Sequence, residues 1–307
     1  MNWAFAPVKT ANAFTPRIQE LVDELIDGFA MAGKCEFIRQ FASPLPIQVI
    51  GSVLGVPESD IGMLKAWSDD FAAVQCGNIP HERLVQVARS VVESQEYFLA
   101  QLEERRREPR DDLLGRMIRP PNGESPLEVP ELLDLINQIM VAGNETTTAF
   151  LGNAMYLLAT TEALTDQLDD TPALIPNLIE EVLRLETVLP AQYRTTTEDV
   201  EISGTRVPAG AKIAVLFASA NRDESYYDEK FKPDRENWPV PHMGFGRGIH
   251  ACIGQALARR EGEIAIERLV KRLTDFRIDP DRLPVRTHLF GLRGLVELHL
   301  RFRPRYS

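Results

Sequence analysis

Only three cysteines occur in the 307-residue sequence, at Cys35, Cys76 and Cys252. An odd number in a chain of this length does not indicate a disulfide framework, and a reducing, cytoplasmic location fits best. The first residues lack a basic segment followed by a long apolar run, so no secretory signal peptide is expected. No apolar run reaches the roughly 18 residues that a membrane helix needs, so no membrane span is expected.

Basic charge is also scarce, because 34 Lys and Arg face 45 Asp and Glu, for a net charge of -11. A nucleic-acid partner would require a basic stripe, so none is predicted. The basic run 105–107 is flanked by acidic residues and is predicted to be a solvated helix end. The composition, 44% hydrophobic and 26% charged, is typical of a globular protein with a large core.

The hydrophobic pattern is helical up to about Thr187, with strands and loops after it. Thr15 and Pro16 have the residue types of a helix start. Further helices are expected at about 44–55, 61–71, 82–107, 176–186 and 252–273, and short strands at 200–203, 207 and 212–217. The predicted fold class is therefore mainly α with small β-sheets (α+β). One unit over 1–307 is expected, helix-rich over 13–187 and with strands and loops over 188–307.

A long segment from Pro130 to about Thr160 contains no proline and predicts one helix about 45 Å long. A helix of that length would be central to the fold. Its middle, 142–148, combines Gly143 with three threonines, which are poor helix formers. Such local conflicts in a core element are often functional.

The strongest chemical signal is the segment Phe245–Gly254, in which a glycine-rich loop delivers Cys252 to the start of a helix. Free backbone N–H groups and the helix dipole stabilise an anion there, which predicts a lowered thiol pKa. Gly246 and Gly248 permit tight turns, and Gly254 would let a flat ligand approach closely.

Three other interpretations of this segment stay open from the residues alone. Cys252 could be an inert core cysteine, which is the usual role of a lone cysteine. The glycines could form a nucleotide loop, although no clear strand precedes them and the dinucleotide spacing fails. Cys252 and His250 could bind zinc, although no second pair of ligands has the spacing of a metal site.

The same segment resembles the haem-binding loop of cytochrome P450 enzymes, and Ala256–Arg259 resembles the bacterial members. The resemblance implies haem b as the cofactor and Cys252 as the thiolate ligand of its iron. It also places Phe245, Gly246 and Gly254 at the haem.

A second segment, Ala142–Thr147, resembles the oxygen-activation motif of this family. The resemblance implies that Ala142 and Gly143 border the haem and that Glu145 and Thr146 relay protons. Without the resemblance, a solvated glutamate and a threonine bonded to its own helix turn would explain the same residues.

A third segment, Glu181–Arg184, matches the Glu-x-x-Arg pair of the family. The spacing puts both side chains on one helix face, where a surface ion pair is the common alternative. The resemblance implies a buried pair with Arg235 as third member, in a structural role.

Two further residues, Arg194 and His250, occupy family positions that contact the haem propionates, and His242 is expected to cap the loop. Arg247, Arg259 and Arg260 are either a small docking patch for a redox partner or solvated arginines.

The family's opening part has no counterpart in this sequence, so an N-terminally truncated member is expected. The stretch before Phe14 lacks the arginine of the family's propionate-binding segment, and Pro7 is expected to disrupt a helix interior.

The resemblance implies a monooxygenase that inserts one oxygen atom from O2 into a lipophilic small molecule. A separate ferredoxin or flavodoxin with its reductase would supply electrons, because no flavin or iron–sulfur motif occurs. The alternatives are a peroxide-driven haem-thiolate enzyme and a truncated, non-catalytic haem-binding remnant. Substrate contacts are expected near Phe71–Ile79, Met140, Leu189–Gln192 and Leu289–Leu292.

Overall fold

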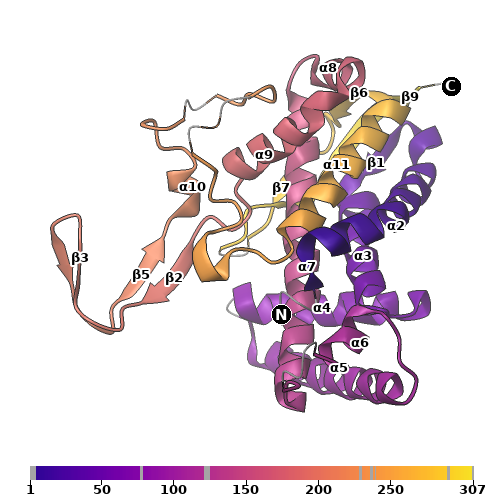
Figure 1. Ribbon diagram of the computed structural model, residues 1–307. Coiled ribbons are helices and arrows are strands. Elements are labelled where there is room, and N and C mark those ends of the chain that lie inside the picture. Colours follow the sequence, from indigo (N-terminus) through magenta and orange to yellow (C-terminus); the bar gives the residue numbers. More distant parts are fainter. Residues whose placement is uncertain are drawn as a thin grey trace.

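The central element of the fold is helix α7 (Val129–Thr160), which runs through the helical body (Figure 1). The computed structural model describes residues 5–76, 79–120, 125–227, 230–235, 238, 240–288 and 291–305. The 32 residues of α7 span about 48 Å at the rise of an α-helix. The helix is uninterrupted, so the single helix predicted for 130–160 is confirmed. Leu132, Ile136, Met140 and Phe150 are among its buried residues and place it in the core.

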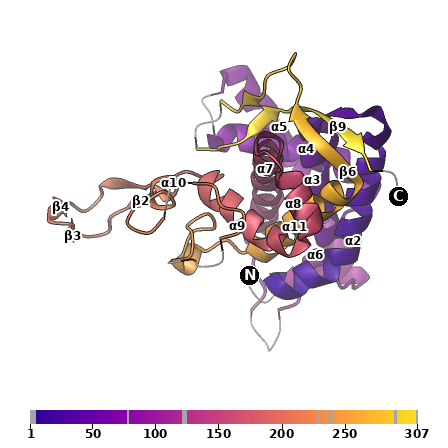
Figure 2. The ribbon, with the colours of Figure 1, turned by 90° about the horizontal axis from the view of Figure 1, so that it is seen from above.

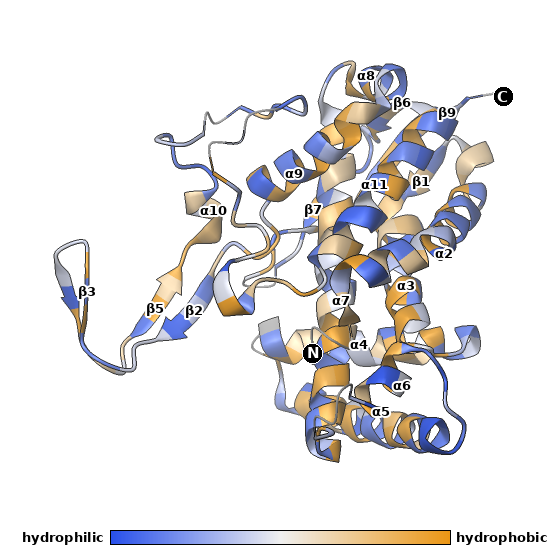
Figure 3. Ribbon diagram, viewed as in Figure 1, coloured by the Kyte–Doolittle hydropathy of each residue, from blue (hydrophilic) through white to orange (hydrophobic). Residues whose placement is uncertain are grey.

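Helices from both halves of the chain surround α7. Helices α3 and α4 pack against α7, whereas α2 packs against α3 and α11. Figure 3 shows that α3 is predominantly hydrophobic, as expected for a helix enclosed by its neighbours. The remaining α-helices are smaller or more peripheral. The helix bounds are α2 (Pro7–Asp27), α3 (Pro44–Leu54), α4 (Ile61–Cys76), α5 (His81–Arg107), α6 (Leu113–Met117), α8 (Leu164–Asp170), α9 (Ile175–Leu185), α10 (Phe217–Ala220) and α11 (Gln255–Arg272).

The described strands form small antiparallel sheets. One sheet has three strands in the order β1-β9-β6, and Lys34 pairs with Arg301 across its β1–β9 ladder. The others are the two-stranded pairs β2–β5, β3–β4 and β7–β8. The pairs β2–β5 and β3–β4 project away from the helical body in both views (Figures 1 and 2). The strand bounds are β1 (Lys34–Glu36), β2 (Gln192–Thr195), β3 (Val200–Ile202), β4 (Thr205–Val207), β5 (Lys212–Val215), β6 (Leu273–Ile278), β7 (Val285–Arg286), β8 (Leu295–Glu297) and β9 (His299–Pro304).

The start of the first long helix differs from the prediction. Helix α2 begins at Pro7, and Pro16 lies inside it. Pro16 has no N–H to donate and costs about 3 kcal/mol in a helix interior. The helix nevertheless continues, because Thr10 and Ala11 are buried on the N-terminal side of Pro16. The prediction that Thr15 and Pro16 start this helix was therefore wrong, and Pro7 occupies the first turn, where proline is tolerated.

The side chain of Arg105 is completely buried, so the prediction that the basic run 105–107 is solvated was wrong at this residue. Its Nε donates to both carboxylate oxygens of Asp112, at 2.9 and 2.8 Å, and its Nη2 donates to the Gly55 carbonyl at 2.8 Å. Gly55 ends α3 with φ +81°, and a Cβ there would lie 2.2 Å from Asp112 Oδ2. Arg105 therefore joins α5 to the end of α3 and the start of α6.

None of the helices in the described ranges is both long enough and apolar enough to cross a membrane.

Candidate active site

A cavity of about 760 Å³ lies between α7, α11 and the loop that carries Cys252. Its walls come from segments far apart in the sequence, because Ile50 of α3, Thr146 of α7, Arg194 of β2 and Cys252 all line it. Its lining is predominantly apolar, and its volume is in the range of roughly 300–1,000 Å³ that is usual for ligand sites.

The cysteine loop is held by its own backbone. The Cys252 N–H donates to the Phe245 carbonyl at 2.9 Å, and the Gly246 N–H donates to the Met243 carbonyl at 2.9 Å. Gly246 and Gly248 have φ values of +64° and +75°, a region that side chains disfavour. These turns bring the loop back on itself and expose the Cys252 thiol to the cavity.

The electrostatics of Cys252 differ from the expectation. Helix α11 begins only at Gln255, with Gly254 as its N-cap. Burial raises the pKa of the Cys252 thiol. The N–H groups of Gly254 and Gln255, which donate to the sulfur, and the positive charge of Arg259 lower it, but burial has the larger effect. The predicted net lowering of the thiol pKa was therefore wrong. The sulfur is accessible from the cavity, yet the surrounding protein desolvates it more than the helix end compensates.

On α7, the residues Ala142, Gly143 and Thr146 line the same cavity as Cys252. The Thr146 hydroxyl donates to the Ala142 carbonyl at 2.7 Å, which is a bond to its own helix turn. A Cβ on Gly143 would lie 3.2 Å from two side-chain carbons of Ile50. Gly143 therefore also permits the close packing of α3 against α7.

Glu145 lies apart from this cavity and contacts α4. Its Oε1 accepts from Asn144 Nδ2 at 2.9 Å and lies 3.7 Å from Lys65 Nζ. Burial raises the pKa of Glu145, and Lys65 and Asp69 are its charged neighbours. The structure therefore separates the expected acid and hydroxyl pair, with Thr146 toward the cavity and Glu145 toward α4.

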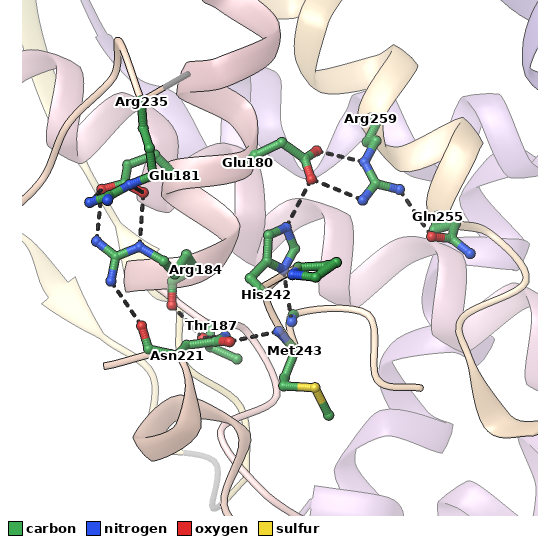
Figure 4. Close-up of polar contacts among 12 residues, drawn as sticks. Glu180, Glu181, Arg184, Thr187, Asn221, Arg235, His242, Met243, Gln255 and Arg259 are labelled. Atoms are coloured by element: carbon green, nitrogen blue, oxygen red, sulfur yellow. Dashed lines mark hydrogen bonds and ion pairs between the residues drawn. The ribbon is translucent and has the colours of Figure 1, made fainter. Parts of the chain in front are cut away.

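The structure brings Glu181, Arg184 and Arg235 together (Figure 4). Glu181 and Arg184 are fully buried, and two guanidinium nitrogens of Arg184 donate to the carboxylate at 2.8 and 2.7 Å. Arg235 donates to the same carboxylate at 3.2 and 3.3 Å. Burial opposes the ionisation of Glu181, but hydrogen bonds from both arginines outweigh it and lower its pKa.

Arg184 and its neighbours also support the cysteine loop. Arg184 Nη1 donates to the Asn221 carbonyl at 2.8 Å. Asn221 is fully buried, its Nδ2 donates to the Thr187 hydroxyl at 2.8 Å, and its Oδ1 accepts the Met243 N–H at 2.6 Å. This chain of bonds connects α9 to the start of the cysteine loop (Figure 4).

A second network, which the sequence did not predict, centres on Glu180. Arg259 Nε and Nη2 donate to its carboxylate at 2.6 and 3.0 Å. His242 Nδ1 accepts the Gly244 N–H at 2.9 Å, so His242 Nε2 carries the hydrogen that Glu180 accepts at 3.0 Å. His242 thus caps the loop, as expected. The only sequence signal was the adjacency of Glu180 to Glu181, since its partners are distant in the sequence.

The arginines proposed as a docking patch are partly engaged. Arg259 pairs with Glu180, Arg260 lies 3.1 Å from Glu263, and Arg247 donates to the Pro241 carbonyl at 2.7 Å. Arg259 and Arg260 are therefore paired with glutamates, and Arg247 is held by a backbone carbonyl, so the three are not a patch of unpaired arginines.

The charged and polar groups of the cavity wall are unevenly partnered. Arg194 and His250 are exposed and line the cavity, and neither forms an ion pair with any residue in the described ranges. Glu261 of α11 is buried and also lines the cavity, and its Oε2 has no hydrogen-bond partner among those residues. Burial raises the pKa of Glu261 to about 8. The sequence analysis missed Glu261, since burial of one glutamate in a charged helix leaves no local signal.

The cavity meets the needs of a haem. Cys252 supplies a sulfur donor for iron, and the apolar walls suit a flat hydrocarbon ring. Arg194 and His250, which lack acidic partners among the described residues, suit the two propionate carboxylates. The zinc alternative has no such support, since no group of three or more His, Cys, Asp or Glu in the described part of the chain is arranged to hold a metal ion.

Comparisons with known proteins agree with this geometry. The sequence model of the cytochrome P450 family matches residues 172–292. Mycinamicin IV hydroxylase/epoxidase from Micromonospora griseorubida is 33% identical over 94% of this chain and 73% of the relative. A steroid C26-monooxygenase from Mycobacterium tuberculosis is 34% identical over 94% of this chain and 77% of the relative.

A solved cytochrome P450 structure from Chondromyces apiculatus superposes with a TM-score of 0.90 at 35% identity. The match covers 100% of this chain and 76% of that one. Such identity over most of each relative confirms the mainly helical fold class and the haem cofactor. The chain therefore belongs to the cytochrome P450 family, as a bacterial haem-dependent monooxygenase.

Proposed function

We propose that Cys252 is the iron ligand and that the cavity is the site where one oxygen atom of O2 enters a lipophilic small molecule. The observation that carries this proposal is the shared cavity, which Cys252 lines from the loop and Thr146 lines from α7. Ala142 and Gly143 border the same space, while Phe245, Gly246 and Gly254 form the cysteine side. Arg194 and His250 would bind the propionates at its edge.

Haem, when bound, supplies the redox chemistry that activates O2, and a cysteine thiolate donates electron density that favours O–O cleavage. The chain's own contribution is to hold the sulfur and to move protons. The Thr146 hydroxyl donates its hydrogen to the Ala142 carbonyl, so its oxygen remains free to accept a hydrogen bond from a proton donor in the cavity.

Glu145 is proposed to exchange protons on the α4 side. Its side chain is 23% exposed and lies beside Lys65, so solvent can reach it. Asn144, which is fully buried, donates to Glu145 and to the Ser68 hydroxyl. This polar cluster lies on the side of α7 away from Thr146, and water would have to complete the relay to the cavity.

A lipophilic substrate is supported by the apolar lining and by the relatives. Leu189 and Gln192 line the cavity, whereas Met140 is buried and its neighbour Ile139 lines the cavity instead. Of the expected contacts at 289–292, residues 289 and 290 lie outside the described residues, as do 77 and 78. The relatives named above act on mycinamicin IV and on a steroid.

Electrons are proposed to come from a separate ferredoxin or flavodoxin with its reductase. The segment just before Cys252 lies at the surface, where Ile249 is 97% exposed and His250 is exposed. A redox protein that docks there would approach the sulfur closely.

The first test is the spectrum of the haem-loaded, reduced protein with carbon monoxide. The red-shifted Soret band of a thiolate-ligated haem is expected for the natural chain and for Cys35→Ala, which removes a buried thiol elsewhere. Cys252→Ala is expected to lose that band. Equal spectra for both variants would contradict ligation by Cys252.

Turnover then separates the remaining alternatives. Product formation with O2, NADPH, ferredoxin and reductase supports the proposal. Turnover with hydrogen peroxide alone would favour the peroxide-driven enzyme, and haem binding without either activity would favour the non-catalytic remnant. A spectral screen of steroids, macrolides, terpenes and fatty acids on the haem-loaded protein would identify the substrate class.

A further inference from the structure

We propose that Glu180 and Arg259 form a charge-compensated pair that sets the reduction potential of the haem held at Cys252. The two are positioning residues for electron uptake, and this inference rests on the proposed ligation of haem by Cys252. The two residues lie on different helices, Glu180 on α9 and Arg259 on α11.

The pair has a defined geometry, which Figure 4 shows. Two nitrogens of the Arg259 guanidinium face the two oxygens of Glu180, at 2.6 and 3.0 Å. Gln255 accepts from the third nitrogen at 3.1 Å, and His242 donates to Glu180 from the other side. Such bidentate contacts fix the plane of a guanidinium more firmly than one contact would.

The guanidinium also lies against the wall of the haem cavity. The Arg259 Cζ is 4.5 Å from the centroid of the Phe245 ring, and Phe245 lines the cavity. The Phe245 carbonyl accepts the Cys252 N–H at 2.9 Å. Only Phe245 therefore lies between the charge of Arg259 and the backbone of Cys252 along this path.

The electrostatic consequence follows from the sign of each charge. Burial opposes the ionisation of Glu180, but hydrogen bonds from His242 and Arg259 lower its pKa to about 2, so it is anionic. The side chains of Arg259 and Glu180 are only 30% and 26% exposed, so solvent screens them incompletely. Reduction adds one negative charge to the site. An uncompensated arginine would favour that electron, and an uncompensated glutamate would oppose it.

The experiment is a spectroelectrochemical titration of the purified, haem-loaded protein, in which an electrode supplies the single electron through mediator dyes. Glu180→Gln is expected to shift the equilibrium toward the reduced form by about tenfold, which is about +59 mV for a one-electron couple. Arg259→Gln is expected to shift it by a similar factor in the opposite direction. The double variant is expected to return to within about threefold of the natural protein.

Matched controls come from the ion pair of Arg106 and Glu103 on α5, whose side chains are 42% and 51% exposed. Arg106→Gln and Glu103→Gln remove the same charges as Arg259→Gln and Glu180→Gln, and neither residue lines the cavity. Each is expected to shift the equilibrium by less than about threefold, because solvent screens exposed pairs.

A structural role alone would move both single variants in the same direction or would abolish haem binding. Arg259→Lys keeps the charge and is expected to stay close to the natural potential, so it tests the inference where Glu180→Gln fails to fold. Single variants that shift in the same direction, or that match the controls, would overturn the inference. Loss of the thiolate band in the natural protein would instead overturn the proposed function, so the two failures are distinguishable.

Discussion

The burial of Glu261 in the cavity wall predicts how the stability of the fold depends on pH. Glu261 is 3% exposed, its Oε2 has no partner among the described residues, and burial raises its pKa from the usual 4.5 to about 8. The folded protein therefore retains a proton that the unfolded chain releases above pH 4.5. A raised folded-state pKa contributes stability that is present below pH 4.5 and is lost as the pH rises to about 8.

The size of this loss follows from the two pKa values. Each pKa unit corresponds to about 1.4 kcal/mol, so the full loss near pH 9 is about 5 kcal/mol. Glu261→Gln is neutral in both states and removes this pH dependence. For a chain of 307 residues, 5 kcal/mol corresponds to about 8 °C in Tm. The variant's Tm relative to the natural protein should therefore rise by about that amount between pH 5 and pH 9.

The assay is thermal unfolding of the haem-loaded proteins across this pH range, followed by circular dichroism. The buried amide adds its own cost of about 1–3 kcal/mol, so the pH dependence is diagnostic and the absolute Tm is not. Glu267→Gln, at an exposed position of the same helix, is the control. A Tm difference between Glu261→Gln and the natural protein that is constant from pH 5 to pH 9 would refute this account of Glu261.

Three further predictions concern the core and the chemistry. Glu181→Gln should destabilise the fold by about 3–5 kcal/mol in thermal unfolding, because it leaves the buried Arg184 poorly paired. Thr146→Ala should lower product per NADPH by at least about tenfold and release hydrogen peroxide, whereas Thr146→Ser should retain coupling. Gly262→Ala would place a Cβ 2.5 Å from Phe150 Cε1 and should lower the free energy of unfolding by about 1–3 kcal/mol. A Cβ added at Gly62 would meet no atom within 4 Å, so Gly62→Ala should raise that free energy by up to about 1 kcal/mol.

Local patterns predicted the helices well where one face is consistently apolar. The segment from Ser43 to Gly55 illustrates this, because Pro44 starts α3 and Gly55 ends it with a positive φ. The start of α2 was predicted less well. Proline at 16 signals a helix start locally, but burial of Thr10 and Ala11 extends the helix beyond it.

Charged residues were the least predictable part of the sequence. Arg105 lies in a run of charged residues that predicts solvent exposure, yet its side chain is fully buried and bonded to Asp112 and to the end of α3. Glu180 and Glu261 likewise have no local pattern that separates them from surface glutamates. The burial of a charge depends on partners from other elements, and a window of sequence contains no information about their approach.

The sequence by itself determined the family, the long central helix and the loop that presents Cys252, since each depends on residue types at fixed local spacing. Only the tertiary structure decided which groups share the cavity, because side chains of α7, β2 and α11 meet there from distant segments. It also decided that Thr146 lines the cavity while Glu145 contacts α4, and that desolvation outweighs the helix end at Cys252. These outcomes depend on distances and solvent exclusion in the assembled fold, which adjacent residues do not specify.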